Sequence, residues 1–134
     1  MKRKSVRIYS FTGTGSCLAL KLAEKLKQEG YVCTGYTVAR FAEDKRLQRL
    51  NDGWKQEIGA SWGEHALVFI GAAGIAIRAI APFVKDKFTD PPVIVLDEKG
   101  TFAIPLLSGH VGGGVTLAKV LAEYTGGRAV ITTA

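Results

Sequence analysis

The stretch Ala66-Leu67-Val68-Phe69-Ile70, which runs directly into Gly71-Ala72-Ala73-Gly74, decides the fold class of this chain. Five consecutive apolar residues are typical of a central parallel strand that is covered on both faces. The glycine turn predicts a short helix over Ile75–Ala81, which Pro82 ends. A buried strand followed by a turn and a helix is the repeating unit of an α/β sheet.

The rest of the chain repeats this unit. Further strands are expected at Val6–Ser10, Tyr31–Val38, Val93–Leu96, Thr101–Leu107 and Ala129–Thr132. Helical spacing of apolar residues runs from Leu18 to Gly30, from Leu117 to Gly126, and from Leu47 to Trp62 with a break at Asn51-Asp52-Gly53. Asp97-Glu98-Lys99-Gly100 has the composition of a hairpin turn. We therefore predict one α/β domain over residues 1–134, a three-layer sandwich with a mostly parallel central sheet and one antiparallel hairpin.

Charge and composition limit the classes of molecule that the chain is expected to bind. A net charge of +6 favours anionic partners, but the basic residues are dispersed and do not alternate with aromatic ones, so no nucleic acid is expected. No apolar run approaches the roughly 20 residues of a membrane span, and Lys2-Arg3-Lys4 leads into a strand. We expect a cytoplasmic protein without a membrane partner. Cys17 and Cys33 are expected to be reduced core residues, His65 is expected at the surface, and no metal-ligand spacing occurs.

Ligands of open α/β sheets bind beyond the carboxyl ends of the parallel strands, and three glycine turns are candidates for that edge. The first is Thr12-Gly13-Thr14-Gly15-Ser16. Its composition resembles that of the phosphate-cradling loop of flavodoxin-like proteins, in which glycines let the backbone approach an anion. The alternative is a tight strand-to-helix turn with Ser16 as the N-cap.

The second turn contains Gly71 and Gly74 and is followed by Arg78. The planar guanidinium of Arg78 can bind a ligand carboxylate with two hydrogen bonds. The alternative is a structural network in which Arg78 pairs with Asp86 or Asp90.

The third turn, Ser108-Gly109-His110-Val111-Gly112-Gly113-Gly114, carries the strongest signal for chemistry. His110 can act as a general base near neutral pH with the Ser108 hydroxyl close in sequence. The N–H groups around Gly112, Gly113 and Gly114 can hold an oxyanion. Alternatively, His110 bonds a backbone carbonyl and the glycines permit close packing of the following helix.

Three segments together carry a family resemblance. They are Phe69-Ile70-Gly71-Ala72-Ala73-Gly74-Ile75-Ala76-Ile77-Arg78-Ala79-Ile80-Ala81-Pro82, then Asp86-Lys87-Phe88-Thr89-Asp90-Pro91-Pro92-Val93 through Gly100, and finally Leu106-Leu107-Ser108-Gly109-His110-Val111-Gly112-Gly113 with Val130-Ile131-Thr132-Thr133-Ala134. From about Gly35 to Ala134 the chain resembles the N-terminal region of the cobalt-precorrin-5A hydrolase family of anaerobic cobalamin biosynthesis. Family members usually continue into a C-terminal domain that this chain lacks, and Gly114-Val115 replaces the Asn or Ala common after the Gly-Gly pair.

The resemblance implies hydrolysis of an anionic cobalt-tetrapyrrole, whose ring-A lactone is opened with release of acetaldehyde. Cobalt would arrive with the substrate, so no protein cofactor is expected. His110 would be the base or an axial ligand to that cobalt, with Ser108 as a second catalytic candidate. Arg78, Lys87 and the glycine turns would bind carboxylates, and Asp97 is a weaker candidate.

Two other functions stay open at this point. The chain could be a non-catalytic module that binds a corrinoid intermediate, or a flavodoxin-like domain that binds a phosphorylated anion. A separate C-terminal-type domain, other enzymes of the pathway or a second copy of the chain are the protein partners that these functions would require.

Overall fold

The computed structural model describes residues 4–108 and 113–132. Within these residues seven strands form one sheet in the order β3-β2-β1-β4-β5-β6-β7. The strands are β1 Ser5–Ser10, β2 Val32–Thr37, β3 Gln48–Arg49, β4 Ala66–Ile70, β5 Val93–Leu96, β6 Phe102–Leu107 and β7 Arg128–Ala129. The helices are α1 Gly13–Gln28, α2 Trp54–Ala60, α3 Ala73–Ile80 and α4 Gly114–Thr125, with short 3-10 turns at Ala39–Phe41 and Ala81–Phe83.

The sheet is parallel from β3 to β5 and changes direction once. β6 runs antiparallel to β5, and β7 runs parallel to β6. The predicted α/β class, the mostly parallel sheet and the antiparallel hairpin are therefore confirmed.

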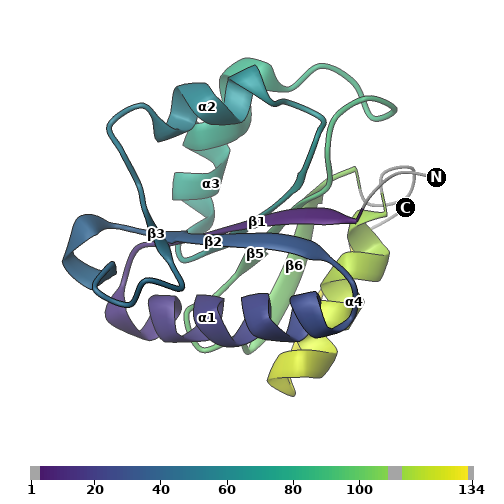
Figure 1. Ribbon diagram of the computed structural model, residues 1–134. Coiled ribbons are helices and arrows are strands. Elements are labelled where there is room, and N and C mark those ends of the chain that lie inside the picture. The colour runs from purple at the N-terminus through teal and green to yellow at the C-terminus, as the bar shows by residue number, and fades with distance from the viewer. Residues whose placement is uncertain (1–3, 109–112, 133–134) are drawn as a thin grey trace.

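Helices cover both faces of the sheet, with α1 and α4 on one face and α2 and α3 on the other (Figure 1). Alternation along the strands supplies both layers. In β4, Val68 and Ile70 belong to the core under α1 and α4, whereas Leu67 and Phe69 belong to the core under α2 and α3. The unbroken apolar run of β4 is thus explained, because each of its faces meets a helix layer.

Both ends of α1 are closed by local hydrogen bonds. Thr12 is the N-cap, and its hydroxyl oxygen accepts a hydrogen bond from the Gly15 N–H at 2.9 Å. The alternative in which Ser16 is the N-cap was wrong, because the helix already begins at Gly13. At the other end Gly30 takes a φ of 90°, and the Tyr31 N–H bonds the Leu26 carbonyl, as in a Schellman motif.

The predicted helical stripe from Leu47 was wrong in its first half. Leu47 is buried in the core instead, because its side chain occupies the space next to Gly35 where a Cβ would otherwise lie. This position directs Gln48–Arg49 along β2 as a short parallel strand. The break at Asn51-Asp52-Gly53 is confirmed, since the Asn51 side chain accepts a hydrogen bond from the Gly53 N–H just before α2.

Other boundaries differ slightly from the expectation. α3 begins at Ala73 rather than Ile75, and Pro82 lies in the 3-10 turn that follows it. β7 has only two residues. Cys33 is buried as expected, but Cys17 is exposed. In the described part of the chain, no helix is long and apolar enough to span a membrane.

The strand directions create two functional edges. We call the end where β1 to β5 finish the carboxyl edge, and the end where they begin the amino edge. Because β6 is antiparallel to β5, Leu107 pairs with Val93 and β6 finishes at the amino edge. The two edges are separated by about 16 Å, the length of the five-residue strand β4 at roughly 3.3 Å per residue.

Candidate functional site

The strand directions divide the predicted site residues between the two edges. Thr12, Gly13, Thr14, Gly15, Gly71, Gly74, Arg78 and Asp97 lie at the carboxyl edge, following β1, β4 and β5. Ser108, Gly113 and Gly114 lie at the amino edge, after β6. The expectation that all three glycine turns converge on one edge was wrong, because it overlooked the reversal of β6.

One pocket lies at the amino edge, and a smaller one, described below, lies at the carboxyl edge. This amino-edge pocket has a volume of about 540 Å³, and its lining includes Lys4, Ser5, Thr89, Asp90 and Gly113. Its size falls within the range of small-molecule sites. The pocket therefore adjoins the third glycine turn through Gly113.

Asp90 is a buried carboxylate that holds this edge together. It is 4% exposed, and both of its carboxylate oxygens accept hydrogen bonds from the Lys85 N–H at 3.0 Å. The Trp62 indole N–H donates to one of them at 2.9 Å. Asp90 thus joins the segment before β5 to the segment that follows α2, and it is not a partner of Arg78.

Ser108 has an unusual backbone conformation at the start of the third turn. Its φ is 55°, a left-handed value that is uncommon for a residue other than glycine. The Ser108 hydroxyl donates to the Asp90 carbonyl at 2.8 Å, and the Ser108 carbonyl accepts from the Gly114 N–H at 3.1 Å. These two bonds fix both ends of the turn, so the Gly114 N–H is not available to an oxyanion.

The central residues of the turn, Gly109, His110 and Gly112, lie outside the described residues. Gly113, with a φ of 86°, is the N-cap of α4 and lines the amino-edge pocket. Of the predicted N–H donors, Gly113 is therefore the one whose position beside the pocket is described.

A hydrogen bond that the sequence did not suggest lies at the same edge. The Ser5 hydroxyl is 2.6 Å from His65 Nδ1, across the starts of β1 and β4. His65 is half-buried, so it lies at the surface but is not fully exposed. The 60-residue separation of this pair in the sequence left no local signal for it.

At the carboxyl edge, the first glycine turn is the opening of α1 rather than a separate loop. The Gly15 N–H is used by the Thr12 cap, and a Cβ on Gly15 would lie within 3.3 Å of Ile70. The Thr12 hydroxyl donates to the Glu98 carboxylate at 2.7 Å. A carboxylate of the chain itself therefore lies beside the N-cap of α1, where its charge disfavours an anionic ligand.

Arg78 lies on α3 above the second glycine turn, where Gly71 has a φ of 150°. Its guanidinium lies against Gly74, with Nη1 3.0 Å from the position that a Cβ would take. In the described part of the chain, no hydrogen bond or ion pair to the Arg78 guanidinium occurs, so the alternative of a structural network with Asp86 or Asp90 was wrong.

Asp97 and Lys87 have local roles. Asp97 accepts hydrogen bonds from the Phe102 N–H at 2.7 Å and the Lys99 N–H at 3.3 Å within the hairpin turn. Partial burial raises its pKa, but these backbone N–H groups outweigh burial and hold the pKa of Asp97 below its usual value. Lys87 is exposed and lies over the ring of Phe88.

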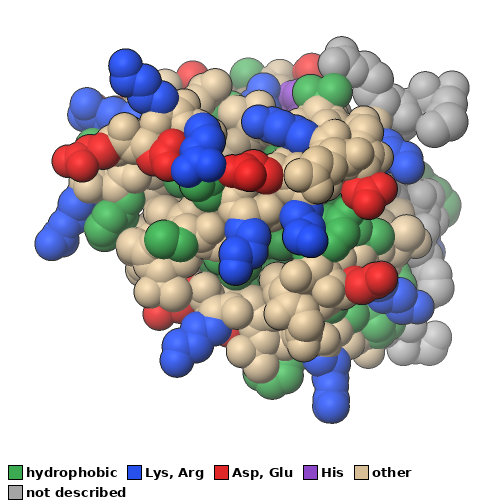
Figure 2. Space-filling model, turned by 60° about the horizontal axis from the view of Figure 1, so that its bottom comes forward, with side chains coloured by type: hydrophobic (Ala, Val, Ile, Leu, Met, Phe, Trp, Pro, Cys, Tyr) green, Lys and Arg blue, Asp and Glu red, His purple; other side chains and the backbone are tan. Residues whose placement is uncertain are grey.

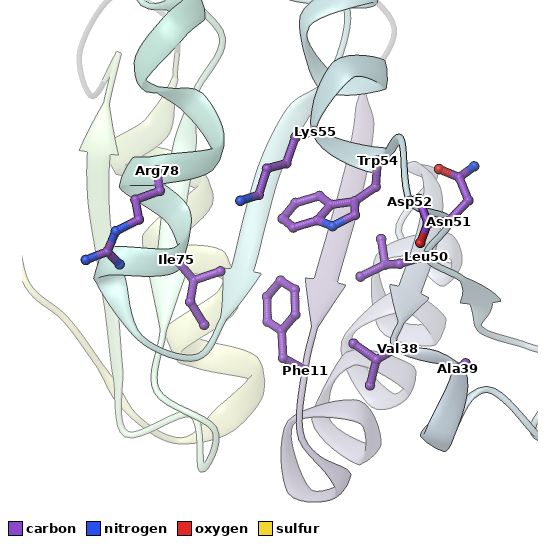
Figure 3. Close-up of a pocket in the computed structure, with 10 residues that line it drawn as sticks. All are labelled: Phe11, Val38, Ala39, Leu50, Asn51, Asp52, Trp54, Lys55, Ile75 and Arg78. Atoms are coloured by element: carbon purple, nitrogen blue, oxygen red, sulfur yellow. The ribbon is translucent and has the colours of Figure 1, made fainter.

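A second pocket, the carboxyl-edge pocket, has a volume of about 420 Å³ and includes Arg78. Figure 3 shows Phe11 and Trp54 facing each other in its middle, with Lys55 extending from α2 toward α3. The sequence indicated Arg78, but it gave Trp54 only as an apolar helix position and gave no role to Phe11 or Lys55. Their shared place becomes visible only once β3, β2, β1 and β4 lie in one sheet.

One face of the molecule shows how the charged side chains are distributed. On the face that bears α1 and α4, Lys and Arg side chains are spread out, with Asp and Glu among them (Figure 2). Within residues 4–108 and 113–132, no three His, Cys, Asp or Glu side chains gather as metal ligands would.

Comparisons with known proteins agree on one family. The family model described as "Cobalamin synthesis G N-terminal" matches residues 58–134. A cobalt-precorrin-5A hydrolase of Salmonella typhimurium is 39% identical over 144 aligned residues, which cover 100% of this chain and 37% of that protein. A cobalt-precorrin-5A hydrolase of Priestia megaterium is 47% identical over 68 residues, 51% of this chain and 18% of that protein.

A solved structure matches the fold as well. The crystal structure of a cobalamin biosynthesis protein G homolog from Sulfolobus solfataricus superimposes with a TM-score of 0.73 and 26% identity, over 96% of this chain and 36% of that one. The chain thus spans little more than a third of the length of the Salmonella and Sulfolobus proteins. Since the family model matches more than half of the chain and the Salmonella protein matches all of it, the chain belongs to the cobalamin synthesis G N-terminal family.

Proposed function

We propose that this chain is the N-terminal part of a cobalt-precorrin-5A hydrolase and that the amino-edge pocket receives the lactone of the substrate. Relatives that carry this name support the reaction. The observation that carries the assignment to this pocket is the pair of hydrogen bonds by which Ser108 fixes both ends of the third turn beside Gly113. The remaining two thirds of the relatives' length would supply further walls of the site.

In the proposed reaction, His110 is the general base. It takes a proton from a water molecule, and the water oxygen attacks the lactone carbonyl carbon. The carbonyl oxygen gains negative charge, which the N–H of Gly113, a residue that lines the pocket, would hold. The bond between the carbonyl carbon and the ring oxygen then breaks, and the ring oxygen takes the proton from His110. Loss of the new hydroxyl proton next breaks the carbon–carbon bond that joins the two-carbon unit to the macrocycle, so this unit departs as acetaldehyde while the macrocycle keeps the electron pair and takes up a proton.

Ser108 has a positioning role in this proposal rather than the catalytic one expected from the sequence. Its hydroxyl is already donated to the Asp90 carbonyl at 2.8 Å within a buried site. A serine whose hydroxyl bonds a backbone carbonyl is poorly placed as a nucleophile, because no base receives its proton.

The proposal extends to the substrate and to the place of the reaction. The net charge of +6 suits a macrocycle that bears several carboxylates, and exposed Lys87 lies near the rim of the pocket through its contact with Phe88. Cobalt would enter as part of the substrate, without a resident cofactor. We place the reaction in the cytoplasm, where thiols such as Cys17 and Cys33 stay reduced.

The test measures acetaldehyde and product mass after the chain is incubated with cobalt-precorrin-5A. We expect release of acetaldehyde, and His110→Ala should lower the rate about 10²- to 10⁴-fold with an unchanged free energy of unfolding. Lys119→Ala, on the exposed surface of α4, is the control and should keep the full rate.

Two results would count against the proposal. Full activity in His110→Ala would exclude this histidine as the base. Neither acetaldehyde nor any change in the cobalt absorption spectrum on mixing would mean that the chain does not bind this substrate. An unchanged cobalt spectrum for substrate bound to His110→Ala, together with slow turnover, would identify a base rather than an axial ligand.

A further inference from the structure

The carboxyl-edge pocket has features that the proposed hydrolysis does not use. It lies at the ends of the neighbouring strands β1 and β4. After β1 the chain continues to β2 on one side, and after β4 it continues to β5 on the other side. The strand order reverses at this point, and open α/β sheets bind their ligands in the crevice outside such a reversal. The carboxyl-edge pocket is about one strand length from the third glycine turn. One small ligand therefore cannot fill both this pocket and the amino-edge pocket.

The floor of the pocket is aromatic and apolar. The rings of Phe11 and Trp54 have centroids 5.7 Å apart at an interplanar angle of 48°, and Ile75 and Leu50 flank them. Figure 3 shows Phe11 below Trp54, with Ile75 on one side of the two rings and Leu50 on the other. Half-exposed aromatic rings of this kind offer a surface on which a flat conjugated ring can stack.

Cationic side chains stand around this floor. The Lys55 ammonium is 5.6 Å from the centre of the Trp54 ring. Arg78 lines the pocket from α3, with its guanidinium beside Gly74 and directed away from Trp54 (Figure 3). Within the described residues neither makes an ion pair, whereas Asp52 is the carboxylate among the lining residues. Two cations that no carboxylate of the chain neutralises are suited to an anionic group on a ligand.

A neighbouring groove extends the same surface. It has a volume of about 380 Å³ and shares Leu50, Asn51 and Trp54 with the carboxyl-edge pocket. Arg7 and Arg49 add two further cations, against the single carboxylate of Glu57, whose side chain accepts a hydrogen bond from Asn51. The combined surface therefore contains aromatic rings together with four cationic and two anionic side chains.

Such sheets usually bind the phosphates of a dinucleotide at the start of the first helix after β1. In this chain the Glu98 carboxylate lies beside that start, where it accepts a hydrogen bond from the Thr12 hydroxyl, and its negative charge disfavours a phosphate there. The positive charge of the pocket comes from side chains of α2 and α3 instead.

We propose that the carboxyl-edge pocket is a second ligand site, which binds a planar conjugated ring bearing carboxylate or phosphate groups. The ring stacks on Trp54, and Lys55 and Arg78 bind the anionic groups. The site is independent of the amino-edge pocket and of the hydrolysis proposed for it.

The test uses two probes, uroporphyrin for a conjugated ring with carboxylates and ADP for one with phosphates, and measures binding by titration calorimetry at fixed ionic strength. Lys55→Ala and Arg78→Ala should each weaken binding about 10- to 100-fold, the effect of a charge-assisted hydrogen bond. Trp54→Ala should weaken it by a similar factor. Lys119→Ala and Arg128→Ala remove the same charges elsewhere and should change affinity less than about twofold.

The outcomes separate the two ligand sources and can overturn the proposal. Tighter binding of uroporphyrin identifies a polycarboxylate ring as the ligand, and tighter binding of ADP identifies a nucleotide. The proposal fails if neither probe binds, or if the control variants weaken binding as much as Lys55→Ala and Arg78→Ala do. It also fails if His110→Ala abolishes probe binding, because the probes would then occupy the amino-edge pocket; the proposed function would be unaffected by that result.

Discussion

At the scale of single residues, Asp90 is the polar group on which the amino edge depends most. Its buried carboxylate accepts hydrogen bonds from Lys85 and Trp62, and its carbonyl accepts one from Ser108. Asp90→Asn replaces one carboxylate oxygen by a donor that faces the Lys85 N–H. We expect this variant to lose about 1.5–3 kcal/mol in the free energy of unfolding, measured by urea denaturation.

Asp52→Asn is the matched control for that substitution. Asp52 is exposed and makes no ion pair within the described residues, so its variant should stay within about 0.5 kcal/mol of the parent. Equal losses in the two variants would mean that Asp90 is not a structural centre of this edge.

The two cysteines should differ sharply in reactivity. Cys33 is buried, and desolvation raises the pKa of its thiol to about 11, whereas Cys17 is exposed. A thiol with a raised pKa stays protonated as the pH rises, so at pH 8 only about one Cys33 in a thousand is thiolate. Iodoacetamide at pH 8 should therefore label Cys17 alone, as read by peptide mass spectrometry, with Cys33 reacting as the pH approaches 11 or in denaturant. Equal labelling of both at pH 8 would contradict the buried position of Cys33.

At the scale of elements, the end of α4 packs closely against the turn between β5 and β6. A Cβ on Gly127 would collide with the carbonyl oxygens of Gly100 and Thr101, whereas a Cβ on Gly126 would meet nothing within 4 Å. Gly127→Ala should cost on the order of 3 kcal/mol through overpacking. Gly126→Ala should cost about 1 kcal/mol, because its φ of 73° is unfavourable for alanine.

Thermal or urea unfolding of the two alanine variants gives the comparison directly. A smaller loss for Gly127→Ala than for Gly126→Ala would mean that α4 can shift away from the hairpin. The positions are adjacent, so the difference between them isolates the close approach from any general preference of the helix end.

Elements could be predicted where one local signal dominates. The apolar run of β4 and the Pro-bounded run of β5 were placed at the correct residues, because burial on both faces leaves no other interpretation. The segment around Leu47 could not be predicted in this way, because its apolar spacing also fits a helix. Only the space beside Gly35, which the Leu47 side chain fills, places this segment next to β2. The N-cap of α1 was missed although the end of β1 was predicted correctly, because Thr12 and Ser16 are both good N-cap residue types and local sequence does not choose between them.

At the scale of the whole molecule, the candidate site was predicted in its parts but not in its arrangement. The glycine turns and Arg78 do lie at strand ends. Their separation followed from the antiparallel hairpin, which the sequence already indicated: a strand that reverses must finish at the opposite edge. The Ser5–His65 pair, by contrast, has no local signal, because its partners come from strands far apart in the chain.

The last prediction concerns the independence of the two edges. Thr12→Ala removes the cap of α1 and should cost about 0.5–2 kcal/mol. Ser108→Ala leaves the Asp90 carbonyl without its donor and should cost about 1–3 kcal/mol. Because about 16 Å of sheet separates the edges and no bond is shared, the double variant should lose the sum of the two to within about 0.5 kcal/mol.

A second pair of substitutions provides the contrast. Trp62 and Asp90 share one hydrogen bond, so Trp62→Phe and Asp90→Asn together should depart from their sum by at least about 0.5 kcal/mol. If Thr12→Ala and Ser108→Ala were coupled as strongly, the sheet would transmit changes from one edge to the other. Ligand binding at the carboxyl-edge pocket could then influence the amino-edge pocket, and the two sites would have to be treated as one system. Additivity would instead mean that a ligand in one pocket leaves the other unchanged, which is what two pockets on opposite ends of a rigid, doubly covered sheet should do.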